Sequence, residues 1–226
     1  GDSMRRVLVA SLAILLPPIV LAASPPTLAQ PTTYGDAMRW YEREANAGSA
    51  KAQYLLGLLH ERGAGPRGKD LEEAVRWFGR AAEQGHAQAQ FKLGIAYQFG
   101  VGVPADAVQA LKWYRRAAEQ GAIEAQFNLA YMLESGLGTV PSPEEAFRWY
   151  RAAAVAGLGR AQMALGALYY RGVGTPVDPV EAWAWLRAAE TQGIDGAAAA
   201  RTHVEDSLDA ADLIKARRLA ESRIKK

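Results

Sequence analysis

The glycine-rich segment from Gly63 to Lys69 resembles a nucleotide-binding loop more than any other part of the chain does. Its spacing matches a dinucleotide-binding loop and most of a P-loop. Both motifs require a β-strand before the loop, so that backbone amides and the N-terminus of the next helix contact phosphate. Here the preceding residues have a helical pattern, and Asp70 stands where a P-loop needs Ser or Thr to bind magnesium. We therefore predict no nucleotide partner.

Other candidates for catalysis or metal binding are weaker. Ser222 and Lys225 have the Ser-x-x-Lys spacing of penicillin-recognising enzymes, but they lie close to the C-terminus and no Lys-Thr-Gly element accompanies them. The three histidines, His60, His86 and His203, have no partner at the spacing of metal ligands. The sequence therefore predicts no catalytic residue, no metal and no cofactor.

Basic residues at helical spacing are the strongest candidate for a binding surface. They stand one residue before and three residues after recurring tryptophans, and positions i and i+4 share a helix face. The candidate partner-binding residues are Arg39, Arg43, Arg76, Arg80, Lys112, Arg116 and Arg148. One interpretation is an ordinary solvated face, in which Glu72 and Glu144 pair with the arginines four residues later. The other is an electrostatic track for an acidic partner segment, which would act mainly on the association rate and its salt dependence.

A tryptophan at a nearly fixed spacing indicates which elements position these side chains. Trp40, Trp77, Trp113, Trp149 and Trp185 are 37, 36, 36 and 36 residues apart. A period of this length is typical of stacked copies of one supersecondary unit. Apolar residues at −3, 0, +1 and +4 relative to each tryptophan fall on one face of a helix, so we expect the five tryptophans to form the structural core of the repeats.

Each copy contains signals for two helices and none for a strand. Good N-cap residues stand at one register, and an acidic residue or a glutamine follows three residues later, which predicts a capping box. The N-cap residues are Thr33, Asp70, Asp106, Ser142 and Asp178. The first helix ends before a recurring glycine, and the second ends at a Gly-x-Gly turn such as Gly100–Gly102.

A glutamine also recurs near the start of each second helix, at Gln53, Gln90, Gln126 and Gln162. Buried polar groups are usually hydrogen-bonded. We therefore expect this side-chain amide to satisfy backbone groups at the turn between the two helices.

The recurring columns are Ala-x-x-Trp-Tyr-x-x-Ala-Ala-x-x-Gly, Ala-Gln-x-x-Leu-Gly-x-x-Tyr and Gly-x-Gly, and one copy reads ALKWYRRAAEQGAIEAQFNLAYMLESGLG. This pattern resembles the Sel1-like repeat, a relative of the tetratricopeptide repeat with a longer period, over residues 33–206. The resemblance implies an all-α fold, a right-handed α-solenoid of stacked antiparallel helix pairs with a concave groove. It also implies the role of an adaptor or scaffold for protein complexes. One cysteine-rich branch of the family is linked to penicillin binding or hydrolysis, but this chain has no cysteine.

The repeats divide residues 30–206 into five expected copies. Their boundaries are 33–69, 70–105, 106–141, 142–177 and 178–206. The fifth copy departs from the pattern, with Ala197-Ala198 in place of Ala-Gln and Thr202 in place of a glycine, so it is either a complete repeat or a degenerate cap. A basic C-terminal capping helix is expected in residues 207–226, because the last repeat has no neighbour to cover it.

Residues 1–29 have the pattern of a segment that is removed on export. The first three residues precede Met4 and are interpreted as an expression remnant or as a misassigned start of the chain. The next residues contain two arginines, an apolar run and then small residues, as in a secretory signal peptide. The apolar run is short for a membrane span. We therefore expect an exported protein, periplasmic or secreted, with no transmembrane span after cleavage; the alternative is an uncleaved N-terminal membrane anchor.

Charge and cysteine content narrow the expected function. A net charge of +2 does not favour a nucleic-acid partner, and the absence of cysteine excludes a lipoprotein anchor. We predict an exported, non-catalytic scaffold or adaptor that binds a protein or peptide partner, acidic in character, in the concave groove. The alternatives are a periplasmic regulator or inhibitor of a sensor or secretion system, and a binder or hydrolase of cell-wall peptide or glycan.

Overall fold

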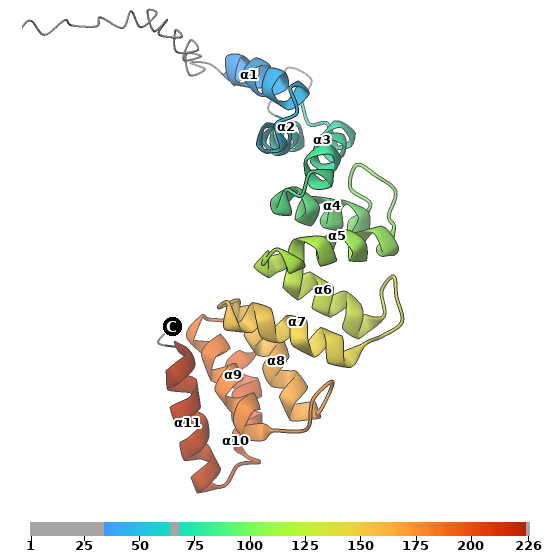
Figure 1. Cartoon of the computed structure of the whole chain (residues 1–226). Coiled ribbons are helices and arrows are strands. Elements are labelled where there is room, and N and C mark those ends of the chain that lie inside the picture. Colours follow the sequence, from blue (N-terminus) through green and yellow to red (C-terminus); the bar gives the residue numbers. More distant parts are fainter. Residues whose placement is uncertain (1–33, 64–67, 225–226) are drawn as a thin grey trace, which may run out of the picture.

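A computed structural model describes residues 34–63 and 68–224, and this part of the chain contains eleven helices and no strand. Figure 1 shows the helices stacked in chain order in one elongated column. The helices are α1 (Tyr34–Asn46), α2 (Ala50–Arg62), α3 (Leu71–Glu83), α4 (Ala87–Phe99), α5 (Ala107–Glu119), α6 (Ile123–Ser135), α7 (Pro143–Val155), α8 (Gly159–Arg171), α9 (Pro179–Thr191), α10 (Ala197–Glu205) and α11 (Ala210–Ile224). The predicted all-α solenoid of stacked helix pairs is confirmed.

Some predictions fall wholly or partly beyond the described ranges. The expected signal peptide in residues 1–29 lies outside them, as do residues 64–67 of the glycine-rich segment and Lys225 of the Ser-x-x-Lys match. A helix, α2, precedes the glycine-rich segment, so the strand that a nucleotide-binding loop needs is absent there. Among the described helices, none combines the length and the apolar character needed to cross a bilayer.

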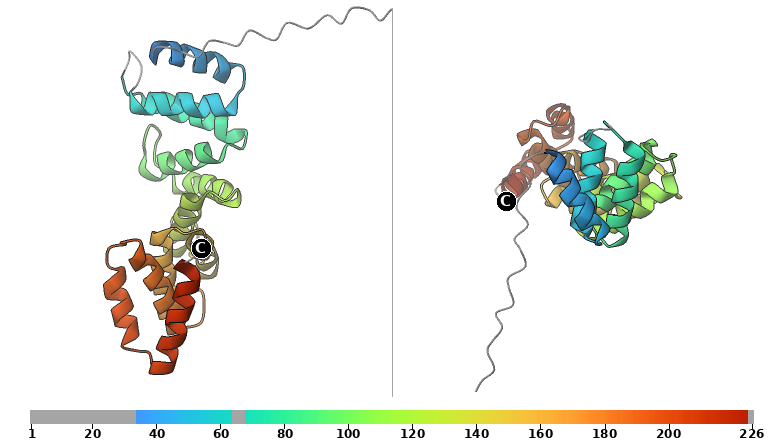
Figure 2. Two further views of the ribbon diagram at one scale, coloured as in Figure 1. Left: turned by 90° about the vertical axis from the view of Figure 1, so that its left-hand side faces the viewer. Right: turned by 90° about the horizontal axis from the view of Figure 1, so that it is seen from above.

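Each second helix packs most closely against the first helix of the next pair, as α2 does against α3 and α4 against α5. Each repeat therefore completes the core of its neighbour. The fifth copy forms a helix pair, α9 and α10, although α10 has only nine residues. The capping helix α11 makes its main contacts with α9 instead of stacking on α10, so α9 lies between α10 and α11 (Figures 1 and 2).

The first helices bury one apolar face against the preceding pair. In α3 the buried residues are Ala74, Trp77, Phe78, Ala81 and Ala82. The indole of Trp77 packs against Leu56 of the preceding pair, and Trp113 and Trp185 pack in the same way. These three tryptophans are only 5–7% exposed. Trp40 and Trp149 are half-buried; Trp40 lies on the first described helix, so no earlier helix of the described chain covers it.

Aspartates begin three of the first helices in the predicted way. A side-chain oxygen of each accepts a hydrogen bond from the amide three residues later, at 2.9–3.0 Å. These residues are Asp70, Asp106 and Asp178. The prediction is wrong for Ser142, whose side chain makes no cap hydrogen bond; Pro143 follows it and needs no amide partner. Thr33 lies outside the described residues.

The reciprocal half of the predicted capping box does not form. In a capping box, the acidic side chain three residues into the helix would accept from the N-cap amide. Here that amide donates to a carbonyl near the end of the preceding helix, as Asp70 N does to His60 O at 3.0 Å. The acidic side chain is therefore left to pair with basic residues, as Glu73 does with Arg76.

The recurring glutamines have the predicted structural role. Each donates its Nε2 to a carbonyl eight residues earlier, at the end of the first helix, over 3.0–3.3 Å. The pairs are Gln53–Ala45, Gln90–Ala82, Gln126–Ala118 and Gln162–Ala154. This hydrogen bond ties the two helices of a pair together.

A second glutamine, at the end of the next first helix, extends this contact between repeats. Its Nε2 donates to the Oε1 of the first glutamine over 2.7–2.9 Å. The donor–acceptor pairs are Gln84–Gln53, Gln120–Gln90 and Gln192–Gln162. In the remaining repeat the donor position holds Ala156, and the buried Oε1 of Gln126 has no hydrogen-bond partner.

Candidate interaction surface

All seven predicted partner-binding residues are exposed on the first helices α1, α3, α5 and α7. We call them the basic face: Arg39, Arg43, Arg76, Arg80, Lys112, Arg116 and Arg148. They lie at equivalent positions of the first helices of four successive repeats, so each of these helices carries positive charge at the same place along its length.

Acidic neighbours neutralise only part of the basic face. Arg39 pairs with Asp36 and Arg76 pairs with Glu73, each across one helical turn. Glu73 does not take part in a capping box, so its carboxylate is available to Arg76. The predicted pair between Glu72 and Arg76 is therefore wrong. Both arginine side chains are at least 70% exposed, and such pairs contribute about 0–1 kcal/mol. The other five residues form no ion pair within the described chain.

Tryptophan rings hold three cations of the basic face in place. The Arg80 guanidinium carbon lies 4.5 Å from the centre of the Trp77 ring, and that of Arg116 lies 4.9 Å from Trp113. The Lys112 Nζ lies 5.6 Å from the same Trp113 ring. Each such contact is worth about 0.5–1 kcal/mol at an exposed site. The signal in the sequence for the two arginine contacts is the spacing of three residues between tryptophan and arginine; Lys112 stands one residue before its tryptophan.

Neighbouring repeats are joined beside this surface by separate ion pairs. Arg115 on α5 pairs with Glu145 on α7, and Glu145 also accepts a hydrogen bond from Trp149 Nε1 at 3.4 Å. The hydrogen bond from Arg115 lowers the pKa of the Glu145 carboxyl, more than burial raises it. Arg115 is therefore committed to holding the repeats together, unlike the free cations of the basic face.

The basic face ends where α11 begins to cover the solenoid. The fifth pair carries Ala184 and Ala188 at the positions of the basic residues, and both are buried. Arg223 of α11 places its guanidinium carbon 4.0 Å from the centre of the Trp185 ring. In the earlier repeats, Arg80 and Arg116 lie over the tryptophan of their own repeat. In the fifth repeat, a residue of the C-terminal helix takes this place over Trp185.

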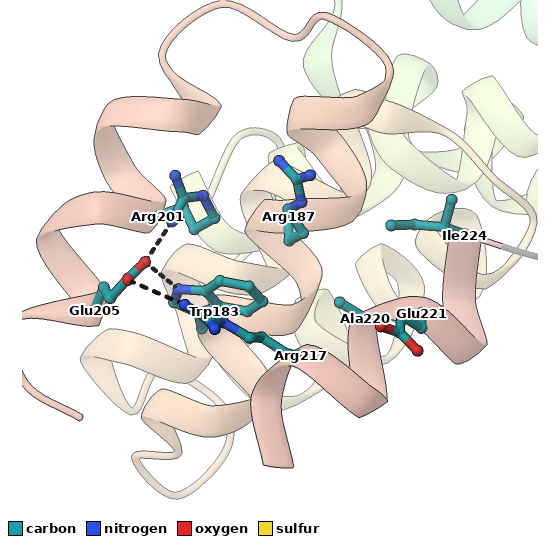
Figure 3. Close-up of a pocket in the computed structure, with 8 residues that line it drawn as sticks. All are labelled: Trp183, Arg187, Arg201, Glu205, Arg217, Ala220, Glu221 and Ile224. Atoms are coloured by element: carbon teal, nitrogen blue, oxygen red, sulfur yellow. Dashed lines mark hydrogen bonds and ion pairs between the residues drawn. The ribbon is translucent and has the colours of Figure 1, made fainter. Parts of the chain in front are cut away.

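A pocket of about 490 Å³ lies between α9, α10 and α11 (Figure 3). Its lining residues are Trp183, Arg187, Arg201, Glu205, Arg217, Ala220, Glu221 and Ile224. Most of its charge is satisfied internally: Arg201 pairs with Glu190 at 2.8 Å and with Glu205, and Glu205 also accepts from Trp183 Nε1 at 2.9 Å. The repeat pattern does not indicate this pocket, because its residues come from three helices, two of which depart from that pattern.

The histidines have structural contacts. His86 caps α4 by accepting from Ala89 N at 3.3 Å, and its ring stacks on Tyr54 with centroids 4.6 Å apart. Burial lowers the pKa of this imidazole. His203 lies 3.2 Å from the hydroxyl of Tyr170, and His60 is half-buried on α2. No group of three or more potential metal ligands occurs among the described residues.

Comparison with known proteins identifies the repeat. The family model of the Sel1 repeat matches residues 50–86, 87–121, 123–158 and 159–194, each running from a second helix into the next first helix. No curated protein matches the chain.

Two solved structures share both fold and sequence with it. One is c5321, a protective antigen present in uropathogenic Escherichia coli strains and displaying an SLR fold; it is 36% identical, with a TM-score of 0.74, over 84% of this chain and 41% of that protein. The other is a Sel1 repeat protein from Oxalobacter formigenes, 36% identical with a TM-score of 0.65, over 70% of this chain and 64% of that protein. The chain thus spans less than two thirds of either relative. With its four matched units, it belongs to the Sel1 repeat family.

Proposed function

We propose that this chain is a non-catalytic scaffold for protein interactions and that its basic face captures an acidic segment of a partner protein. Sel1 repeat proteins are generally scaffolds for protein interactions. The observation that carries the proposal is the set of exposed cations held on tryptophan rings in consecutive repeats, at Arg80, Lys112 and Arg116. None of the three is neutralised by an ion pair within the described chain.

Ordering these side chains before binding favours capture. A flexible side chain loses about 0.5–1.5 kcal/mol when it is immobilised at an interface, and contact with a tryptophan ring reduces that loss. The basic face also raises the rate of encounter with an acidic segment, an effect that salt weakens. Binding should therefore be fast at low ionic strength and should slow as salt is added.

We also propose that the protein works outside the cytoplasm. The support is the segment before the repeats, which has two arginines, an apolar run and small residues in the order of a signal peptide. The similar E. coli protein is described as a protective antigen, which supports an exported location. Fractionation of cells that produce the full chain tests this point, since recovery of the uncleaved chain in the cytoplasm would overturn it.

Crosslinked co-purification from a cell-envelope fraction tests the scaffold proposal. The test variant reverses the charge of Arg76, Arg80, Lys112 and Arg116 together. A matched control reverses four exposed basic residues away from the basic face and changes the net charge by the same amount. The control residues are Lys51, Arg62, Lys69 and Arg218. Thermal unfolding of both variants shows whether each remains folded.

We expect wild type and control to retain a protein partner and the test variant to lose it. The loss should be largest at low salt, because screening removes the attraction that the variant abolishes. Equal capture by all three proteins would overturn the role of the basic face. Retention of cell-wall fragments with no protein partner would overturn the scaffold proposal and favour a cell-wall binder.

A further inference from the structure

The C-terminal helix shows how the exposed side of a first helix can be covered in this fold. Helix α11 lies along α9 (Figures 1 and 2) and packs on the side of α9 that carries Ala184, a position equivalent to the basic face of the earlier repeats. The buried Ala184 and Ala188 of α9 stand 72 residues after Lys112 and Arg116 of α5, which is two repeat periods. The covered surface of α9 and the open surface of α5 are therefore equivalent.

Small side chains make the contact between α11 and α9. Ala216 and Ala220, one helical turn apart on α11, are buried in the same cluster as Ala184. Val180, four residues before Ala184, packs against this cluster as well. On α9 the stripe that includes Ala184 runs through Val180, Ala184 and the buried Ala188 at i, i+4 and i+8.

Helix α5 carries the same stripe in an open form. Its residues are Val108, Lys112 and Arg116, and Val108 is 60% exposed. The valine is shared with α9, whereas α3 and α7 carry Glu72 and Glu144 at that position. Among the described first helices with a basic face, α5 thus presents an apolar contact followed by two cations without ion pairs.

We infer that α5 is the docking site for a partner helix that carries one apolar residue and two carboxylates on a single face. The apolar residue covers Val108, and the carboxylates pair with Lys112 and Arg116. Lys112 is equivalent to Ala184 of α9, which packs with Ala216 and Ala220 of α11. Residues four and eight positions apart on the partner lie on one face, so a helix supplies all three contacts at once. The inference rests on the proposed function and names the partner's secondary structure and its place on the solenoid.

The loop before α7 borders the apolar end of this site. Gly138 has a φ of +73° and lies against the backbone of Ala107 and Val108, so closely that any side chain there would overlap it. Leu137, beside this glycine, is 39% exposed. The partner's apolar residue therefore meets a surface with two exposed aliphatic side chains nearby.

A pair of synthetic 15-residue peptides tests the inference. Both contain the same alanines, glutamates, lysines and one leucine; one places leucine and two glutamates at i, i+4 and i+8, and the other disperses them around the helix. Binding is measured by fluorescence anisotropy, and the helical content of the bound peptide by circular dichroism. We expect the aligned peptide to bind at one site, at least about tenfold more tightly than the dispersed one, and to gain helicity.

Two exchanges between repeats give matched controls. Val108→Glu installs the residue of α3 and α7 at an exposed position and should weaken the aligned peptide about tenfold or more. Glu72→Val combined with Glu73→Gln, the residue that α5 carries as Gln109, removes the ion pair of Arg76 and gives α3 the stripe of α5. This double variant should raise the stoichiometry from one site to two. Equal binding of the two peptides, or bound peptide without added helicity, would overturn the inference. Those results leave the proposed function standing, because its test is the loss of partner capture on charge reversal.

Discussion

Replacing Ala156 with glutamine should stabilise the protein, because this residue stands where three other repeats place an inter-repeat hydrogen bond. The Oε1 of Gln126 is buried without a partner, whereas the equivalent oxygen of Gln90 accepts from Gln120 at 2.7 Å. The backbone is already suitable: φ and ψ are −73° and 0° at Ala156, against −88° and 4° at Gln120. Ala156 is exposed, as are the glutamines at the equivalent positions, Gln84, Gln120 and Gln192, so the position is expected to accommodate a glutamine.

The expected gain follows from satisfying one buried acceptor. A hydrogen bond of this type contributes about 0.5–1.5 kcal/mol net, and leaving a buried acceptor unpaired costs about 1–3 kcal/mol. Ordering a partly exposed glutamine offsets part of this gain, by less than the ~2 kcal/mol of a fully buried one. We therefore expect about 0.5–1 kcal/mol of added stability and an increase in Tm of about 1–4 °C. The reverse change, Gln120→Ala, should cost about 1–2 kcal/mol because it orphans Gln90 Oε1.

Thermal and urea unfolding followed by far-ultraviolet circular dichroism measure these differences. Ala156→Glu is the matched control, because a carboxylate has the same size but cannot donate a hydrogen bond to Gln126. The control should give no gain. Stabilisation by glutamate equal to that by glutamine, or no stabilisation by glutamine, would refute the account of the glutamine contacts.

Three further predictions concern the core and pH. Trp113→Ala should cost about 3–5 kcal/mol, because it removes a buried indole between two repeats; a thermal midpoint close to wild type would contradict this packing. Gly94→Ala should cost about 1–3 kcal/mol, since its Cβ would overlap the ring of Tyr114, whereas Gly79→Ala, with nothing within 4 Å of the new Cβ, should gain up to about 1 kcal/mol. Equal changes in urea unfolding would argue against the close approach at Gly94. The pKa of His86 lies below its ordinary value of 6.5 because of burial, so protonation favours the unfolded chain. The stability that neutral His86 contributes is complete above pH 6.5 and is lost as the pH falls below that value. His86→Ser, which can still cap α4, should remove this part of the pH dependence. If the thermal midpoint of the variant followed that of the wild type between about pH 5 and 8, the prediction would be contradicted.

The repeat pattern was sufficient to predict the architecture, because one register of tryptophan, glycine and cap residues sets both helices of every copy. It did not predict where the cap amides go. Sequence spacing alone made Glu73 the partner of the Asp70 amide, but that amide is already bonded to His60 O across the loop. A competing contact from the preceding helix is a tertiary effect that a local motif does not contain.

The C-terminal helix was predicted as a cap, but its position on α9 was not. The sequence signal for this position was the replacement of basic residues by Ala184 and Ala188, which are buried in the structure. The replacement can be interpreted only when the side of α9 that contacts α11 is known, and this contact is seen only in the folded chain. Residues 1–29 lie beyond the described structure, so export and cleavage stay predictions, and so does an acidic partner.

Site-specific photocrosslinking in intact cells tests the central claim most directly. A photoreactive residue at Glu119 is exposed on α5, seven residues after Lys112 and thus on the same face of the helix, and the control at Gln88 is exposed on α4. We predict a discrete crosslinked protein from Glu119 that is lost when Lys112 and Arg116 are reversed in charge, and none from Gln88. A partner that crosslinks from Gln88 and not from Glu119 would contradict the claim that the basic face of the first helices is the binding surface.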